Sequence, residues 1–309
     1  MPRISSLAYD YIVPNTTRST FPSSPLLQCF ILGSIAVVIW FHPLMSSFAL
    51  ALSDEQYTHI LLILPISATL MFLDWKSPES LSRRDRSIAV GLLAIAFVMT
   101  AVVRLRVVPL PPDVQLAVNM LAFVVWWIAA FLFCFGSRAV RRSLFALCFL
   151  FWMVPLPHFL MNPIVSLLQR GSAASARLLF AAVGIPVAQQ GMFVHIPGLT
   201  LEVAPECSSI RSSSMLVVTT MVLAHLLLRS FWPKALVVAV AIPLSVAKNG
   251  LRIFVLAILG TRVDPSFLTG RLHRQGGVIY FLIALLAILL LVLILSRREE
   301  KEQSRPALT

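Results

Sequence analysis

Residues 277–296 read GVIYFLIALLAILLLVLILS and contain no charged side chain. An α-helix needs about 20 consecutive apolar residues to cross the hydrocarbon core of a bilayer, and this stretch has that length. The rest of the chain is similar, because 58% of its 309 residues are hydrophobic and only 12% are charged. Soluble domains carry about 25% charged residues. The sequence therefore predicts an all-α polytopic membrane protein.

Seven further apolar runs precede this stretch. We expect eight transmembrane helices, at residues 26–45, 57–73, 88–103, 115–135, 143–162, 207–228, 232–260 and 277–296. The second and third are short. The seventh has a polar middle, KNGLR, at residues 248–252. Pro155 and Pro157 should kink or end the fifth, because proline interrupts the hydrogen-bond ladder of a helix.

The first run is followed by Ala49-Leu50-Ala51, which has the small-x-small pattern of a signal-peptide cleavage site. The run spans about 19 residues and 25 residues precede it, whereas the apolar region of a signal peptide has roughly 7–15. We therefore favour an uncleaved first helix, with cleavage as the alternative.

Basic residues divide unevenly between alternate loops, with 15 on the side of the N-terminus and 7 on the other. Cytoplasmic loops are enriched in Lys and Arg. We therefore expect both termini in the cytoplasm. Residues 1–25 and 297–309 are predicted to be cytoplasmic tails, the second basic and disordered, around a membrane domain at 26–296. This bias also explains the net charge of +12. We do not expect the protein to bind nucleic acid, because no basic stretch with interleaved aromatic residues occurs in a soluble segment.

The largest extracytoplasmic segment is predicted at residues 163–206. Its first part, 163–183, has an apolar face interrupted by Gln and Arg, which is typical of an amphipathic helix lying in the membrane interface. Its second part has two short apolar stretches, 192–196 and 199–203, on either side of Pro197-Gly198. That arrangement predicts a β-hairpin.

Polar residues crowd residues 205–214, PECSSIRSSS, where the sixth span begins. A thiol at a helix N-terminus sees the positive end of the helix dipole, and Arg211 lies one turn beyond Cys207. Both favour the nucleophilic thiolate. The alternative is an ordinary serine-rich helix cap in which Cys207 only fills space. The other three cysteines lie in apolar runs and are expected to be small hydrophobic residues without disulfides.

Arg252 lies eight residues before the expected outer end of the seventh span, or about 12 Å at a rise of 1.5 Å per residue. A charged residue at such depth is costly. It either extends its side chain to the interface or faces the bundle interior, where it would bind a substrate carboxylate or a developing oxyanion. Asn249 lies close to it in the same polar middle.

His273 precedes the last span, on the same side of the membrane as Cys207 and Arg252. A histidine in a loop is usually not catalytic, but a Cys–His pair suffices for acyl transfer. Tyr57 and His59 open the second span on that side and are candidates to join the site. The sequence has no His-Glu-x-x-His, paired Cys-x-x-Cys or phosphate-binding glycine loop. We therefore expect no metal and no cofactor.

Taken together, these motifs resemble the exosortase/archaeosortase family of membrane cysteine transpeptidases over roughly residues 26–296. The matching elements are Glu206-Cys207-Ser208 with Ile210, Asn249-x-x-Arg252, His273-Arg274 before two glycines, and, upstream, Tyr57-x-His59, Pro155-x-Pro157, Leu168-Gln169 and Gly184 through Gly191. One departure is Ser209, where many members have glycine.

The resemblance implies that Cys207 is the nucleophile, Arg252 the transition-state stabiliser and His273 the acid and base. The expected supporting residues are Glu206, Ser208, Arg211, Asn249, Tyr57 and His59. The implied partners are membrane-anchored proteins with a C-terminal sorting signal, which consists of a short motif such as Pro-Glu-Pro, one helix and a basic tail. The implied location is the inner membrane of a prokaryote, with the site on the extracytoplasmic side.

Two other functions remain open. An enzyme acting on a polyprenyl-linked or other anionic lipid could use Arg252 for phosphate, although its spans would be expected to carry acidic residues for a metal. A transporter could line its path with the polar seventh span, but it predicts inverted repeats, which the sequence does not show. A purely structural membrane protein leaves Arg252 without a role.

Overall fold

The computed structural model describes residues 25–73, 82–203, 210–268 and 276–303. Within these ranges, six single helical segments are long and apolar enough to span a membrane: Glu55–Leu73, Arg83–Arg104, Pro112–Arg142, Ile210–Leu227, Phe231–Arg262 and Gly277–Lys301. Two bent pairs of helices raise the number of candidate spans to eight if each pair is one span. The chain is an all-α polytopic membrane protein, as its composition predicts.

The helices of the first half are α1 (Pro25–Ile39), α2 (Phe41–Ser53), η1 (Glu55–Tyr57), α3 (Ile60–Leu73), α4 (Arg83–Arg104), α5 (Pro112–Arg142), α6 (Leu144–Phe149) and η2 (Leu150–Met153). Those of the second half are α7 (His158–Ala182), α8 (Ile210–Leu227), α9 (Phe231–Arg262), η3 (Pro265–Leu268) and α11 (Gly277–Gln303). The strands are β1 (Ala188–Gln190), β2 (Phe193–Ile196) and β3 (Leu199–Glu202).

The first predicted span is bent by 70° between α1 and α2. Pro43 lies in the first turn of α2, and in a continuous helix its ring would clash with the carbonyl four residues earlier, that of Ile39. The guanidinium of Arg104 donates to this Ile39 carbonyl, which is the last residue of α1. A side chain of α4 therefore donates a hydrogen bond to a carbonyl beside the bend, and this contact stabilises the bend.

The fifth predicted span turns by 94° at the break between η2 and α7. Pro155 and Pro157 lie in this break, as the prediction of a kink required. The boundaries differ from the expectation, because residues 158–162 belong to α7 and not to the preceding segment. The predicted amphipathic helix is present but begins at His158, directly after the second proline.

The predicted hairpin is confirmed and forms part of a three-stranded antiparallel sheet in the order β1-β2-β3. Ile196 pairs with Leu199 across Pro197-Gly198, and Gly198 has φ +81°, as the third residue of a type II turn requires. The strand β1 was not predicted. Its three residues are too few to show an alternating pattern.

The helix α11 continues to Gln303, so the expectation of a disordered tail after Ser296 is wrong for residues 297–303. Glu299 explains the extension. Its carboxylate accepts the backbone N–H groups of Arg229 and Ser230, each at 2.9 Å, directly before α9 begins. The end of α11 thus neutralises the positive N-terminal end of α9.

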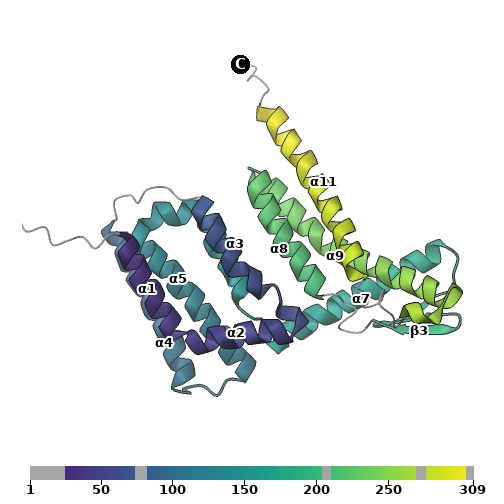
Figure 1. Cartoon of the computed structure of the whole chain (residues 1–309), viewed down its shortest axis with the longest axis horizontal. Coiled ribbons are helices and arrows are strands. Elements are labelled where there is room, and N and C mark those ends of the chain that lie inside the picture. The colour runs from purple at the N-terminus through teal and green to yellow at the C-terminus, as the bar shows by residue number, and fades with distance from the viewer. Residues whose placement is uncertain (1–24, 74–81, 204–209, 269–275, 304–309) are drawn as a thin grey trace, which may run out of the picture.

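Two groups of helices lie side by side (Figure 1), with α1 to α5 in one and α8, α9 and α11 in the other. The helix α7 runs beneath the second group towards the sheet. The second group has its own apolar core between α8, α9 and α11, while the sheet packs on α7 and the last part of α9. The helix α9 contacts α7, α8 and α11, so it is the central element of this half.

Candidate functional site

The structure describes five of the predicted site residues: Arg252, Asn249, Arg211, Tyr57 and His59. The other four, Glu206, Cys207, Ser208 and His273, lie outside the described residues. Their sequence neighbours are described, however. Val203 and Ile210 flank the segment with Cys207, and Gly276 follows the segment with His273. The contacts of these flanking residues are part of the described structure.

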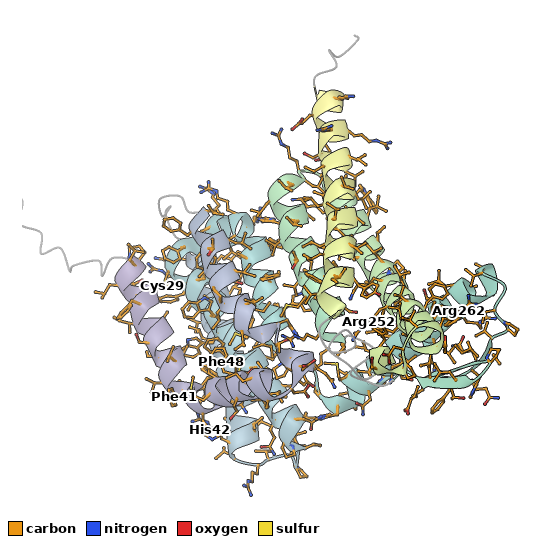
Figure 2. All side chains as sticks on the ribbon, turned by 45° about the vertical axis from the view of Figure 1, so that its right-hand side comes forward. Cys29, Phe41, His42, Phe48, Arg252 and Arg262 are labelled. Atoms are coloured by element: carbon orange, nitrogen blue, oxygen red, sulfur yellow. The ribbon has the colours of Figure 1, made fainter. Side chains whose placement is uncertain are left out.

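The polar middle of α9 lies inside an unbroken helix. Lys248 and Asn249 are only 6% and 2% exposed, and Arg252 is half-buried one turn further along. Figure 2 shows Arg252 at the foot of α11, on the opposite side of the molecule from Cys29. These polar groups contact neighbouring helices, which is one of the two arrangements left open for Arg252.

Arg252 lies against the start of α11. A Cβ atom on Gly277 would lie 3.6 Å from Nη1 and 3.8 Å from Cζ of Arg252, which is ordinary van der Waals contact. Tyr280, one turn along α11, is within electrostatic range of the same guanidinium. Gly277 follows His273 by four residues, so Arg252 adjoins the element that the His273 segment leads into.

Lys248 lies against the start of α8. Its ammonium donates to the hydroxyl of Ser212, in the first turn of that helix. Ile210, the first residue of α8, follows Cys207 by three residues. One face of α9 thus contacts the first turns of both helices that follow the two predicted catalytic segments.

Gln169 on α7 fixes the chain where it leaves the sheet. Its side-chain N–H donates to the carbonyl of Val203 at 2.7 Å, and the side chain is 4% exposed. Val203 precedes Cys207 by four residues. Three residues along α7 from Gln169, the buried Ser172 hydroxyl accepts a hydrogen bond from Asn249 at 3.0 Å. The helix α7 therefore connects the end of β3 with the polar middle of α9.

The helices α7 and α9 approach each other closely at Gly250. A Cβ atom there would lie 2.4 Å from Cβ of Ser175 and 2.9 Å from the backbone nitrogen of Ala176. Small residues let helices approach closely within a membrane. Only glycine fits at this position, and its absent side chain brings Asn249 within reach of Ser172.

Arg211 reaches η1. Its guanidinium forms an ion pair of 3.4 Å with Glu55, and both side chains are more than half exposed. An exposed pair of this kind contributes at most about 1 kcal/mol to stability. It nevertheless shows that the start of α8 lies beside the first turn of the segment that holds Tyr57 and His59.

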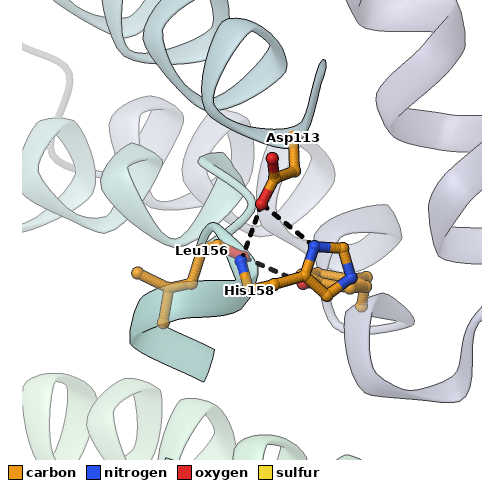
Figure 3. Close-up of polar contacts among 4 residues, drawn as sticks. Asp113, Leu156 and His158 are labelled. Carbon is orange, nitrogen blue, oxygen red and sulfur yellow. Dashed lines mark hydrogen bonds and ion pairs between the residues drawn. The ribbon is translucent and has the colours of Figure 1, made fainter. Parts of the chain in front are cut away.

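Tyr57 and His59 are both buried, and their described contacts lie at the break before α7. The Tyr57 hydroxyl donates to the Leu156 carbonyl at 2.9 Å, and the ring of His59 meets that of Trp152 edge-on at 5.9 Å. Close by, Asp113 accepts hydrogen bonds from the backbone N–H and the ring of His158 at 2.9 and 3.0 Å (Figure 3). These contacts hold the proline-containing break in place.

Asp264 lies between α9 and η3, in the part of the chain that leads towards His273. Its carboxylate accepts the backbone N–H of Ser266 at 2.7 Å. This hydrogen bond, together with a second from the Ser266 hydroxyl, holds the pKa of the Asp264 carboxyl below its usual value. Asp264 therefore stabilises the start of η3 as an anion.

The position of Arg252 along α9 is given by its neighbours. The helix α9 ends ten residues beyond it, at Arg262, but the residues between pack partly on the sheet and not only on other spans. Lys248, one turn before Arg252, contacts the first turn of α8. Arg252 therefore lies one turn along α9 from the contact with the beginning of α8.

Four polar residues connect these elements: Lys248, Ser212, Gln169 and Ser172. The sequence interpretation named the first three without giving them a contact, and it did not name Ser172. Each is a polar residue within a largely apolar helix, and this is the sequence feature that could have indicated a contact between helices. Among the described residues, no group of three or more His, Cys, Asp or Glu side chains is placed to hold a metal ion. The described part of the site consists of cations, hydroxyls and amides around the first turns of α8 and α11.

A family model described as Transmembrane exosortase (Exosortase_EpsH) matches residues 40–290. The matched region contains Cys207, Arg252 and His273 and covers every element that contributes to the site. No curated protein and no solved structure matches the chain. The family is one of membrane cysteine peptidases and transpeptidases. Because the match extends over most of the sequence, the chain belongs to the transmembrane exosortase family.

Proposed function

We propose that the chain cleaves the C-terminal sorting signals of exported proteins through a thioacyl-enzyme intermediate on Cys207, for surface anchoring or secretion. The observation that carries this proposal is the position of α9. Its polar face contacts α8 just after the Cys207 segment and α11 just after the His273 segment. A single helix can thereby hold Arg252 beside two groups that come from distant parts of the sequence.

The proposed reaction begins with the Cys207 thiolate attacking the carbonyl carbon of the scissile peptide bond. Arg252 stabilises the negative oxygen of the tetrahedral intermediate by donating N–H hydrogen bonds to it. His273, in its protonated form, transfers a proton to the departing amine as the C–N bond breaks. The N-terminal part of the substrate then remains as a thioester on Cys207, which an acceptor amine or water releases.

The setting in the membrane suits this chemistry. A substrate with a single transmembrane helix can lie beside the bundle and present the residues before that helix at the start of α8. The proposed orientation has both termini in the cytoplasm and the site on the extracytoplasmic side of the inner membrane. Glu206, Ser208, Asn249 and Arg211 are proposed to position the reacting groups.

The proposal is tested by cleavage of a membrane-anchored reporter in proteoliposomes. The reporter carries a candidate signal, one span and a basic tail, and the released fragment is measured. Cys207→Ala should abolish release. Cys148→Ala is the matched control, since Cys148 lies exposed on α6, and it should leave release unchanged. Full activity of the Cys207→Ala variant would refute the cysteine mechanism.

A lipid-modifying enzyme or a transporter is the alternative. Both predict that Cys207→Ala keeps its function, and the transporter also predicts solute flux in proteoliposomes without any reporter. A peptidase predicts that Cys207→Ala loses its function and that no solute flux occurs without the reporter.

A further inference from the structure

Six exposed arginines lie where the start of α4 meets the end of α5. We call them the arginine cluster: Arg83, Arg84, Arg86, Arg138, Arg141 and Arg142. The two helix ends are joined by Asp85, whose carboxylate accepts hydrogen bonds from the backbone N–H and the hydroxyl of Ser137, each at 3.2 Å. This contact brings basic residues from two distant parts of the sequence to one end of the first group of helices.

This end of the molecule carries a surplus of positive charge. Residues 74–87 and 137–142 together contain seven basic and three acidic residues, a net charge of +4. The surplus remains whichever side chains form ion pairs within these two segments. Basic pockets between membrane helices bind anionic headgroups, and a guanidinium fits a phosphate well because its N–H donors lie in a planar fork.

The arginines of α5 lie beyond a break in that helix. Gly136 has φ +78° and ψ 173°, a conformation that glycine adopts easily and that interrupts the helix. Asp85 binds the first N–H after the break, that of Ser137, and so holds the last six residues of α5 against the start of α4. The basic end of α5 therefore departs from the line of the apolar part.

An apolar cavity of about 630 Å³ lies between α1, α3 and α5. The described residues that line it are apolar apart from Ser34. Phe30 and Val38 line it and are exposed, so the cavity opens on the outer surface of the helix group. Its volume falls within the range of about 300–1,000 Å³ that is typical of small-molecule sites. In a membrane protein, such an opening suits a hydrocarbon chain.

The cavity adjoins the arginine cluster. Phe135 lines the cavity, and because consecutive Cα atoms are 3.8 Å apart, Cα of Arg138 lies at most about 11 Å from Cα of Phe135. Leu26 in the first turn of α1 and Met71 in the last turn of α3 also line the cavity, so it extends to the same end of the helices. An apolar cavity and phosphate-binding groups are thus next to each other, as the chain and headgroup of a phospholipid are.

We propose that the cavity and the arginine cluster together bind an anionic phospholipid, with an acyl chain in the cavity and the phosphate on the arginines. Charge favours this occupant. A zwitterionic lipid brings no net negative charge to the cluster. The span of a sorting-signal substrate would bring a basic tail against it, and such a contact between like charges is costly. This inference does not depend on the proposed cleavage reaction.

The first experiment measures which lipid the protein retains. Full-length protein is placed in nanodiscs with equal amounts of phosphatidylglycerol and phosphatidylcholine of the same chain length, then extracted and analysed by native mass spectrometry. Phosphatidylglycerol should be retained about tenfold more often. The double variant Arg138→Gln, Arg141→Gln should retain both lipids to a similar extent. Equal retention of the two lipids by the wild-type protein would overturn the proposal.

The matched control for charge is Arg297→Gln, Arg298→Gln. It removes two exposed arginines from α11, in the other group of helices, and should keep the preference for phosphatidylglycerol. A loss of preference in this control equal to that in the Arg138, Arg141 variant would also overturn the proposal, because the overall charge and not the cluster would then select the lipid.

The second experiment locates the acyl chain in the wild-type protein. Phosphatidylglycerol with a photoreactive diazirine on its acyl chain should label residues 26–38 and 127–135. Ser34→Trp, which fills part of the cavity, should remove most of this labelling. Ile35→Trp is the control, since Ile35 is exposed on the same helix and is not among the residues that line the cavity.

Three results would contradict a lipid in the cavity. The first is labelling spread evenly over all spans. The second is a preference for phosphatidylglycerol that is lost with the arginines but unaffected by Ser34→Trp, which would mean that the cluster binds a headgroup or free phosphate without the cavity. The third is labelling that a single-span peptide with a basic tail displaces and unlabelled phosphatidylglycerol does not, which would make a substrate helix the occupant.

Discussion

The guanidinium of Arg252 on α9 rests against Gly277, the first residue of α11, where a Cβ atom would lie 3.6 Å from Nη1. This contact allows a graded test. Gly277→Ala should fit and keep reporter cleavage within roughly twofold of wild type. Gly277→Leu should displace the guanidinium and lower kcat/KM by about 10²-fold, since small misplacements of catalytic groups are costly. Equal activity of both variants would show that the position of Arg252 does not matter.

Arg252 itself should contribute mainly to the chemical step. Arg252→Gln is expected to lower kcat by about 10²- to 10³-fold, the usual effect of removing an oxyanion donor. Arg252→Lys should recover only part of this loss, because an ammonium lacks the planar fork of N–H donors. Arg262→Gln is the control, since Arg262 is exposed at the end of the same helix. The account fails here if Arg252→Gln changes KM but not kcat.

The crossing of α7 and α9 should be intolerant of any side chain at position 250. Gly250→Ala would place its methyl group 2.4 Å from Cβ of Ser175, so the helices must separate, at a cost of about 1–3 kcal/mol. Gly171→Ala meets only Val246, at 3.1 Å, and should cost less. Thermal unfolding in detergent measures both. Ser175→Gly should rescue Gly250→Ala in part, and an absence of rescue would place the strain elsewhere.

The hydrogen bond from Asn249 to Ser172 gives a fourth prediction, which is independent of the others. Asn249→Ala should lower the free energy of unfolding by about 0.6–1.7 kcal/mol, the range found for buried polar contacts in membranes. Ser172→Ala should have a similar effect, and the double variant should lose little more than either single one. Additive losses would show that the two residues act separately.

Much of the fold could be predicted from composition and periodicity. Long apolar runs set the spans, proline marked the turn before α7, and Pro197-Gly198 marked the hairpin. The 70° bend at Trp40 was missed, although Pro43 was visible, because α1 and α2 form a single apolar run. The helical continuation to Gln303 was missed because it depends on a long-range contact, between Glu299 and the start of α9.

The sequence could indicate which residues have unusual chemistry but not what they contact. Arg252 was recognised by its depth in an apolar run, and its neighbour Gly277 could not be inferred from local pattern. Lys248 was noted in the polar middle of the seventh span, but it was given no role because it adjoined the more familiar Asn249-x-x-Arg252 motif. Its contact with Ser212 arises only when α8 and α9 pack together. Tyr57 and His59 were named as candidates from their motif, but their contacts with Leu156 and Trp152 could not be inferred, because those contacts depend on how the chain turns before α7.

The central claim, a thioacyl intermediate on Cys207, is tested most directly by mass spectrometry of the protein during cleavage of the membrane-anchored reporter. The account predicts an adduct with the mass of the reporter's N-terminal fragment on the peptide that contains Cys207. Hydroxylamine should release this adduct as a hydroxamate. The adduct should be absent from Cys207→Ala and unaffected by Cys148→Ala. Cleavage that proceeds without any adduct, or with an adduct on another residue, would contradict the account.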